Sequence, residues 1–343
     1  MPTLPALDIR TNINHSPHIV ILGAGASKAA FPIGDAHGRT VPVMRELMES
    51  LDLISCLEKR VLLSDATDFE SLYDELYSLG QYPDLLKDIE SRVQSYFSKL
   101  CLPDRATIYD YLVLSLREKD IIASFNWDPF LALAWQRNSH VVKLPRIVHL
   151  HGNVEIAVCM KCRVKDFRGN ICKKCTKVLS PAPLLYPVKH KNYNSNPYIR
   201  SEWNELRHFF KYNYFLTIFG YSAPRTDIEA RTLLLDAWKD NPTFELAQID
   251  IIDKKPKMEL ASNWREFFCR NHYGIFKSIW HSYLFRHPRR SCEAFAMATL
   301  QQMPWHANPF PKTTKLQRLQ EWARLLWKEE TEGKLSGNPI KFV

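Results

Sequence analysis

The sequence lacks several features that would place it in a special class of protein. No apolar run reaches the roughly 18–20 residues of a membrane-spanning helix, so we expect no membrane association. The segment from Met1 to Pro17 contains no apolar stretch of the signal-peptide kind, so the expected location is the cytoplasm. Internal repeats and low-complexity tracts are also missing. Hydrophobic residues make up 45% and charged residues 24%, which is ordinary globular usage.

The eight cysteines are not needed as disulfides, because a chain of 343 residues can bury a large core. Four of them form two C-x-x-C pairs, Cys159/Cys162 and Cys172/Cys175, with nine residues between the pairs. Each pair places two thiolates on one tight turn, and two pairs complete a closed tetrahedral site without an open position for water. We therefore predict a structural Zn²⁺ ion in a small module.

Negative charge is almost absent around these cysteines. Nine Lys and Arg residues but a single Asp lie between Cys159 and Lys191, whereas the net charge of the whole chain is +9. A chain-wide nucleic-acid binder would spread basic charge over a larger face. Part of the charge offsets the double negative charge of four thiolates and one Zn²⁺. A solvated basic face and a nucleic-acid contact through the zinc module both remain open.

Strand-like apolar runs alternate with helical patterns along the chain, which favours a parallel sheet covered on both faces. The expected strands lie within 18–25, 120–125, 140–144, 146–150, 214–220, 248–253 and 274–277. Helical spacing runs from about Val41 to Glu118 and recurs at 201–211, 227–238, 258–269 and 314–330. The expected fold class is α/β, a Rossmann-like doubly wound parallel sheet with a helical insertion and a small zinc-binding module.

These patterns divide the chain into four parts. A Rossmann-like domain is expected at 18–41, 119–158 and 199–280. Residues 42–118 form the helical insertion, 159–198 the zinc module with its linker, and 281–343 a C-terminal helical extension.

A glycine turn, Gly23–Ala24–Gly25–Ala26–Ser27, follows the first expected strand and precedes a helix. Glycines let the backbone approach a diphosphate, and a helix N-terminus supplies N–H groups with partial positive charge. The second half of the G-x-G-x-x-G pattern is absent. The turn alone therefore also fits a tight strand-to-helix connection without a ligand.

Two further polar segments close strands, 124–128 (SFNWD) and 149–153 (HLHGN). The carboxyl ends of parallel strands meet at one edge of a sheet, so both segments should face the same crevice as the glycine turn. Each also has a simpler explanation. Asp128 before a proline fits a helix N-cap, Asn126 fits a turn, and His151 fits a buried hydrogen-bonded histidine.

The ordered motifs resemble those of the sirtuin superfamily, which shows GAG-x-S, then N-x-D, then HG, then two C-x-x-C pairs. Here these are Gly23–Ser27, Asn126–Asp128, His151–Gly152 and the four cysteines, and the resemblance covers roughly residues 18–280. The chain resembles the prokaryotic defence-associated sirtuin-like branch more than it resembles the protein deacylases. Members of that branch carry G-Y-S-x-P-x-x-D after a later strand, as Gly220–Asp227 does here.

The resemblance implies that NAD is the substrate. Asn126 would position the ribose and the attacking water, Asp128 would hold the nicotinamide carboxamide, and His151 would be the general base. The diphosphate and ribose would be cradled by Gly23, Ala24, Gly25, Ser27, Gly220 and Ser222. By its position after a strand, Asp253 would reach the adenosine ribose or simply be a turn residue.

Two departures from deacylating sirtuins bear on the reaction. Phe31–Gly38 stands where those enzymes have G-I-P-D-F-R, and Leu185–His190 stands where they have a peptide-docking F-G-E-like segment. The resemblance then implies an NAD⁺ hydrolase that releases nicotinamide and ADP-ribose, as an NAD-depleting effector of prokaryotic antiviral defence. A protein deacylase and a catalytically silent NAD- or ADP-ribose-binding subunit are the alternatives.

An enzyme that destroys NAD must stay silent until it is triggered. The resemblance therefore implies a regulator, either a partner such as an ATPase or an Argonaute-like protein, or self-assembly.

Overall fold

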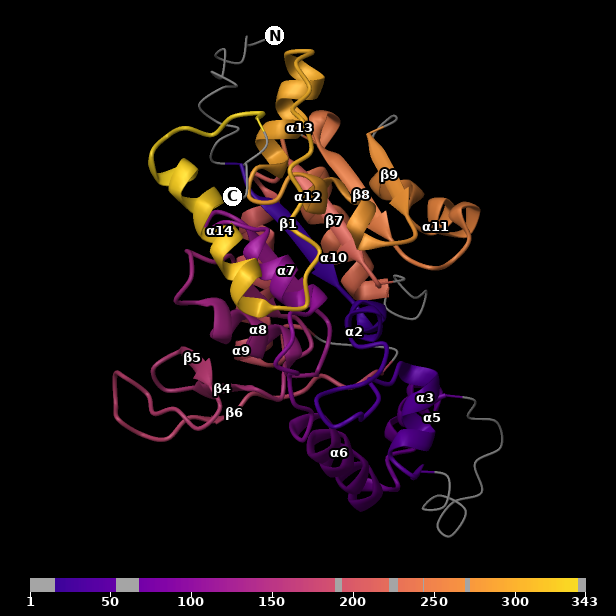
Figure 1. The fold of residues 1–343 in the computed structure, drawn as a ribbon. Coiled ribbons are helices and arrows are strands. Elements are labelled where there is room, and N and C mark those ends of the chain that lie inside the picture. Colours follow the sequence, from indigo (N-terminus) through magenta and orange to yellow (C-terminus); the bar gives the residue numbers. More distant parts are fainter. Residues whose placement is uncertain are drawn as a thin grey trace.

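The computed structural model describes residues 16–53, 68–188, 193–221, 228–242, 244–268 and 272–338. At its centre lies a six-stranded sheet in which every neighbouring pair of strands is parallel (Figure 1). The strand order is β3 (Arg146–His149), β2 (Ile121–Ser124), β1 (His18–Leu22), β7 (Phe215–Phe219), β8 (Gln248–Ile252) and β9 (Tyr273–Phe276). The predicted α/β class is confirmed.

Both faces of the sheet are buried, and alternate residues of β1 enter two separate cores. Val20 and Leu22 belong to one core, whereas Ile19 and Ile21 belong to the other. The first core includes residues of α7 (Ile108–Leu114), α8 (Phe130–Asn138) and α14 (Leu316–Thr331). The second includes residues of α9 (Pro197–Phe210), α10 (Ile228–Lys239) and α11 (Lys257–Asn263). Burial on both sides explains why β1 is a continuous apolar run rather than an alternating one.

The helical insertion contributes α3 (Met44–Ser50), α5 (Phe69–Leu79) and α6 (Pro83–Ser98). Figure 1 shows these helices beyond α2 (Ala24–Ala30), which follows the carboxyl end of β1. Asp68 caps α5 by accepting from the Ser71 N–H, and Gly80 ends that helix with a φ of +65°. The helical prediction for this region is confirmed in its described part.

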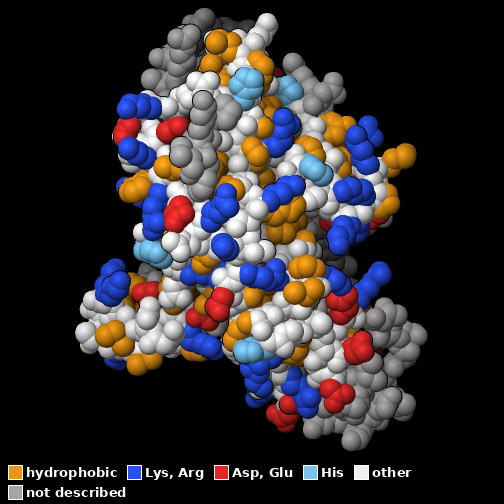
Figure 2. All heavy atoms as spheres, viewed as in Figure 1, with side chains coloured by type: hydrophobic (Ala, Val, Ile, Leu, Met, Phe, Trp, Pro, Cys, Tyr) orange, Lys and Arg blue, Asp and Glu red, His pale blue; other side chains and the backbone are white. Residues whose placement is uncertain are grey.

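The zinc module contains a small antiparallel sheet of β4 (Ile156–Cys159), β5 (Val164–Phe167) and β6 (Ser180–Pro181). Lys165 fastens it to the main domain, because its Nζ lies 2.7 Å from Glu202 Oε1 of α9 and donates to the Ile147 carbonyl oxygen. Figure 2 shows that Lys and Arg side chains also lie over other parts of the visible face. Exposed basic residues are therefore not confined to this module.

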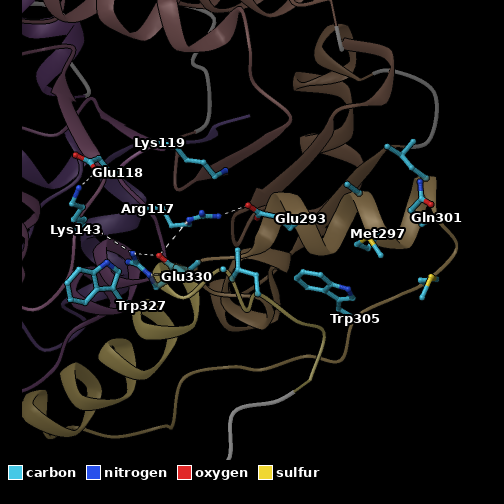
Figure 3. A pocket seen from close by; sticks show the side chains of 16 residues that line it. Arg117, Glu118, Lys119, Lys143, Glu293, Met297, Gln301, Trp305, Trp327 and Glu330 are labelled. Carbon is cyan, nitrogen blue, oxygen red and sulfur yellow. Dashed lines mark hydrogen bonds and ion pairs between the residues drawn. The ribbon is translucent and has the colours of Figure 1, made fainter. Parts of the chain in front are cut away.

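The C-terminal extension forms α12 (Tyr283–Arg286), α13 (Ser291–Leu300) and α14, of which only α14 is predicted from the sequence. It builds a cavity of about 1060 Å³ at the amino edge of the sheet, where Arg117 and Lys119 precede β2 (Figure 3). Arg117 pairs there with Glu293 at 2.5 Å and with Glu330 at 3.7 Å.

One predicted strand is wrong, and one predicted helix is shorter than expected. Residues 140–144 form no strand, because Val141 N–H bonds to the Asn138 carbonyl oxygen and closes a turn after α8, while Val141 and Val142 pack into the core. The helix expected at 258–269 ends at Asn263 and is followed by a short 3₁₀ turn at Arg265–Phe267. Within the described residues, no helix combines the length and apolarity that a membrane crossing requires.

Candidate active site

Several strand ends meet at the carboxyl edge of the sheet. Leu22, the last residue of β1, pairs with Ser124 of β2 and with Phe219 of β7. Ser124 in turn pairs with His149 of β3. The residues that directly follow these strands therefore lie along one edge, as the order of motifs predicts.

Two glycine turns touch backbone to backbone at this edge. Gly23 N–H donates to the Phe219 carbonyl oxygen at 3.1 Å, and Gly25 N–H donates to that of Gly220 at 3.0 Å. A Cβ on Gly23 would lie 2.5 Å from the Gly220 oxygen, and one on Gly220, whose φ is +63°, would lie 2.1 Å from Ala26 N. These glycines are required for the contact itself, and the Gly25 amide is already used by it.

Asn126 is held by its amide nitrogen. Nδ2 donates to the Gly23 carbonyl oxygen and to Ser27 Oγ, both at 2.9 Å. Reversing the amide would set two acceptor oxygens against each other, so the hydrogen-bond pattern determines its orientation. Within the described part of the chain, no hydrogen bond reaches Asn126 Oδ1, which is left to accept from a ligand or water.

Asp128 is buried beside Asn126 and bonds in two directions. Its Oδ2 accepts from the Ser27 hydroxyl at 2.6 Å, and its Oδ1 accepts from Phe130 N–H at 3.2 Å in the first turn of α8. Burial raises the pKa of Asp128 from 3.8 to about 6, because the charged carboxylate is removed from water. Asp128 thus contacts the first turn of α8, as the simpler explanation predicts, while its other carboxyl oxygen belongs to the cluster around Ser27.

Tyr109 of α7 completes this cluster, although it is not among the site residues predicted from the sequence. It is fully buried, and its hydroxyl lies 2.6 Å from Ser27 Oγ and 3.3 Å from Asn126 Nδ2. Packing of α7 against α2 brings it there. The local sequence of α7, IYDYLVL, reads only as a buried helix, so no local signal distinguishes this tyrosine.

Asn153 joins two of the strand-end segments. Its Nδ2 donates to the Asp128 carbonyl oxygen at 2.6 Å, and its Oδ1 accepts from Glu155 N–H at 2.9 Å. Val154 N–H also donates to the Trp127 carbonyl oxygen at 3.1 Å. Asn153 lies in the HLHGN motif but had no predicted role, and its contacts fix the loop that carries Asp128.

His151 lies beside the cluster but not in it. Its Nε2 is 3.0 Å from the Tyr193 hydroxyl, and its ring meets the Phe125 ring edge to face at 4.8 Å. Phe125 in turn stacks on Tyr221 with ring centroids 4.2 Å apart. Phe125 also lines the cavity that Asn126 and Asp128 share, whereas His151 is not among the described residues that line it.

The cavity at this edge is small, about 40 Å³. Its polar wall comes from Ser27, Asn126 and Asp128, and Ala24 also lines it. The helical insertion and the segment leading into it cover this wall with the apolar side chains of Val41, Pro42, Met44, Leu47 and Phe97. Among the described residues, these apolar side chains therefore lie opposite the polar wall of the cavity.

The remaining predicted nucleotide contacts are not assembled in the same way. Asp253 follows β8, but its Oδ1 accepts from Lys255 N–H at 2.9 Å, which is the turn interaction considered above as the simpler explanation. Ser222 and the rest of the motif after Tyr221 lie outside the described residues.

The four paired cysteines come together as predicted. The Sγ atoms of Cys159, Cys162, Cys172 and Cys175 all lie within 4.8 Å of one another, and those of Cys159 and Cys175 are 3.7 Å apart. Four sulfurs at about 2.3 Å from a central Zn²⁺ would be roughly 3.8 Å apart, so the cluster fits the ion. The backbone N–H groups of Lys174 and Cys175 lower the pKa of Cys172, whereas the side-chain hydrogen bond with Cys175 raises that of Cys162.

No family model matches the sequence, and a search of curated proteins finds no match. Among solved structures, the chain is similar to a Sir2 homolog–NAD complex at 15% identity, with 77% of this chain and 86% of that chain covered and a TM-score of 0.40. A mutant Sir2 homologue bound to 2′-O-acetyl ADP-ribose is 13% identical, with 94% and 98% covered and a TM-score of 0.41. At these TM-scores and identities, the roles of residues in those proteins cannot be assigned to residues of this chain.

Proposed function

We propose that the protein binds NAD at the carboxyl edge of its sheet and hydrolyses the nicotinamide–ribose bond, releasing nicotinamide and ADP-ribose. The observation that carries the proposal is the pairing of Asn126 and Asp128 on one cavity wall, where Asn126 has a determined amide orientation and an unused Oδ1. The order of the sequence motifs supports NAD over other ligands of a doubly wound sheet.

The reaction builds positive charge on the anomeric carbon as the C–N bond breaks and nicotinamide leaves with the electron pair. Water forms the new bond to that carbon and gives up a proton. Asn126 Oδ1 orients the ribose or the water, and the Asp128 carboxylate accepts a hydrogen bond from the nicotinamide carboxamide. Because the pKa of Asp128 is about 6, most of this carboxyl is charged at neutral pH.

His151 is the proposed general base, acting on a ribose hydroxyl or on water. His151 contacts Phe125, which lines the cavity, so this role requires the substrate to extend past the Phe125 ring to reach the imidazole. The hydrogen bond to Tyr193 then serves to hold the imidazole in place until the substrate binds.

Apolar side chains of the insertion line the small cavity beside Asn126 and Asp128, so we propose that the insertion moves before the substrate enters. This closed state supports control by a second event. We propose a regulatory partner, of the ATPase or Argonaute-like kind, or self-assembly, as the trigger of an NAD-depleting defence enzyme. The defence role rests on the sequence motifs.

The test is nicotinamide release from NAD by the purified protein beside Asn126→Ala and His151→Ala. His149→Ala is the matched control, since His149 is equally buried two residues away but lies near Lys165 rather than at the cavity. We expect about 100-fold loss in both site variants and retained turnover in the control. Full turnover in both site variants would contradict the assignment.

Two other outcomes identify the alternatives. Nicotinamide release that requires an acylated peptide and yields acyl-ADP-ribose identifies a deacylase. Tight NAD or ADP-ribose binding without turnover, even when the closed state is relieved by substitution, identifies a nucleotide-binding regulatory subunit.

A further inference from the structure

The hydrogen bonds around Ser27 admit one direction when Asp128 is charged. Ser27 Oγ is close to three groups, the Tyr109 hydroxyl, Asn126 Nδ2 and Asp128 Oδ2. Asn126 Nδ2 donates only, and a charged carboxylate accepts only. Ser27 must therefore give its single hydrogen to Asp128, and the Tyr109 hydroxyl must donate to Ser27 Oγ.

We propose that Tyr109 is a positioning residue of this site. Its hydroxyl donates to Ser27 Oγ, so that the Ser27 hydroxyl donates to the Asp128 carboxylate, and it holds the Asn126 amide nitrogen away from the cavity. The proposal rests on the function proposed above and extends it to a residue of α7. Tyr109 itself does not line the cavity with Ser27, Asn126 and Asp128, so it acts through them.

Tyr109 is well suited to donate. It is fully buried, and burial together with the nearby Asp128 charge raises its pKa well above 10, so the phenol keeps its proton. A donor to Ser27 Oγ makes the Ser27 hydroxyl a stronger donor in turn, since hydrogen bonds in a buried chain polarise one another. The Asp128 carboxylate is thereby stabilised against its burial.

Few other groups compete for Asp128. From α2 it meets the Ser27 hydroxyl, from α8 the Phe130 N–H, and from α7 the titratable Tyr109. Among the described residues, no Lys, Arg or His forms an ion pair with it or shifts its pKa. The insertion faces the same cavity with apolar side chains, those of Met44, Leu47 and Phe97. Among the described side chains, the hydrogen-bonded pair of Tyr109 and Ser27 is thus the one that stabilises the charge of Asp128.

The first test uses stability, which needs no substrate. The folded pKa of Asp128, about 6, exceeds its unfolded value of 3.8, so the buried charge costs stability above pH 6 and the cost fades as pH falls below 6. Tyr109→Phe should raise the folded pKa further. Its loss of Tm should then be about 2 °C larger at pH 8 than at pH 5.

Tyr111→Phe is the matched control. Tyr111 also lies in α7 and is buried, but its hydroxyl bonds to the Pro311 and Thr313 backbone, away from Asp128. Its loss of Tm should be equal at the two pH values. Adding Asp128→Asn to Tyr109→Phe should remove the pH dependence. Equal losses at both pH values for Tyr109→Phe would overturn the proposal, whether or not NAD is cleaved.

The second test uses the pH profile of nicotinamide release. The part of the acid limb that Asp128 sets, near pH 6 in the wild type, should move up by roughly half a unit to one unit in Tyr109→Phe and stay in place in Tyr111→Phe, while the part set by the general base His151 should move in neither. In a Ser27→Ala background, Tyr109→Phe should add no further shift, and an additive shift would contradict the relay. Absence of release from every protein tested contradicts the proposed function instead, while the Tm comparison still decides the role of Tyr109.

Discussion

The two edges of the central sheet differ in how polar groups and empty space are combined. At the amino edge a cavity of about 1060 Å³ is lined by charged side chains that pair with one another, such as Arg289 with Glu330. At the carboxyl edge a cavity of only about 40 Å³ contains Asn126 with an unused acceptor and Asp128 with a raised pKa. The larger cavity therefore lies at the amino edge, whereas the polar groups available to a ligand lie at the carboxyl edge.

The difference shows why the smaller cavity is the better candidate for catalysis. Ion pairs between Arg117, Arg289 and Glu330 tie the C-terminal extension to the sheet and satisfy their own charges. A group that acts on a substrate must instead keep an atom available to contact it, and such groups often have a shifted pKa. The carboxyl edge has both properties, and apolar side chains of the insertion cover it.

The largest difference is expected between a cysteine of the zinc module, next to the carboxyl edge, and a cysteine at the amino edge. Leu185 N–H, which follows the module, donates to the His151 carbonyl oxygen, so the carboxyl edge depends on this segment. Cys172→Ser should abolish zinc binding and unfold the module, since structural Zn²⁺ supplies about 10–16 kcal/mol in small zinc domains. Cys292→Ser, at an equally buried cysteine near Lys119 at the amino edge, should retain one zinc per chain. Elemental analysis of both variants decides it, and zinc retained in Cys172→Ser would contradict the site.

The amino edge should respond to substitution in stability alone. Arg289 is almost fully buried and bonds to Glu330 and to the carbonyl oxygens of Leu114 and Leu116. Arg289→Ala should lower the free energy of unfolding by about 3–5 kcal/mol, because Glu330 loses a buried partner. Lys143→Ala, which breaks an exposed pair with Glu118, should change it by less than about 1 kcal/mol.

Chemical denaturation measures both effects, and nicotinamide release by folded protein should be unchanged in each variant. A loss of turnover in folded Arg289→Ala would show that the amino edge takes part in the reaction, and would break the contrast between the edges.

Opening the carboxyl edge should change activity by less than removal of a site residue does. Phe97 and Phe69 both meet the Trp127 ring edge to face, at 5.9 Å and 6.2 Å, but only Phe97 lines the small cavity. Both alanine variants should lose about 3–5 kcal/mol of stability. Only Phe97→Ala should raise nicotinamide release, by roughly tenfold if the closed state limits access. Equal activity in the two variants would show that the insertion does not control entry.

The strands of the sheet could be predicted because burial on both faces leaves short apolar runs that need no long-range information. The same signal fails at 140–144, where two buried valines pack from a turn rather than a strand. It also fails at α13, SCEAFAMATL, because a helix buried on most sides has no polar stripe to reveal its period.

The site divides in the same way. Asn126 and Asp128 could be predicted because they follow a strand, and the carboxyl ends of parallel strands are brought together by the topology. Tyr109 could not, because its place beside Ser27 depends on how α7 packs against α2. The contact between the rings of His151 and Phe125 depends likewise on tertiary packing.

The central claim, that the carboxyl edge cleaves NAD, is tested most directly by nicotinamide release from Phe97→Ala with and without Asn126→Ala. We predict release by the opened single variant without any peptide, and at least about 100-fold less from the double variant. Equal release from both, or NAD binding without release in the opened variant, would contradict the claim.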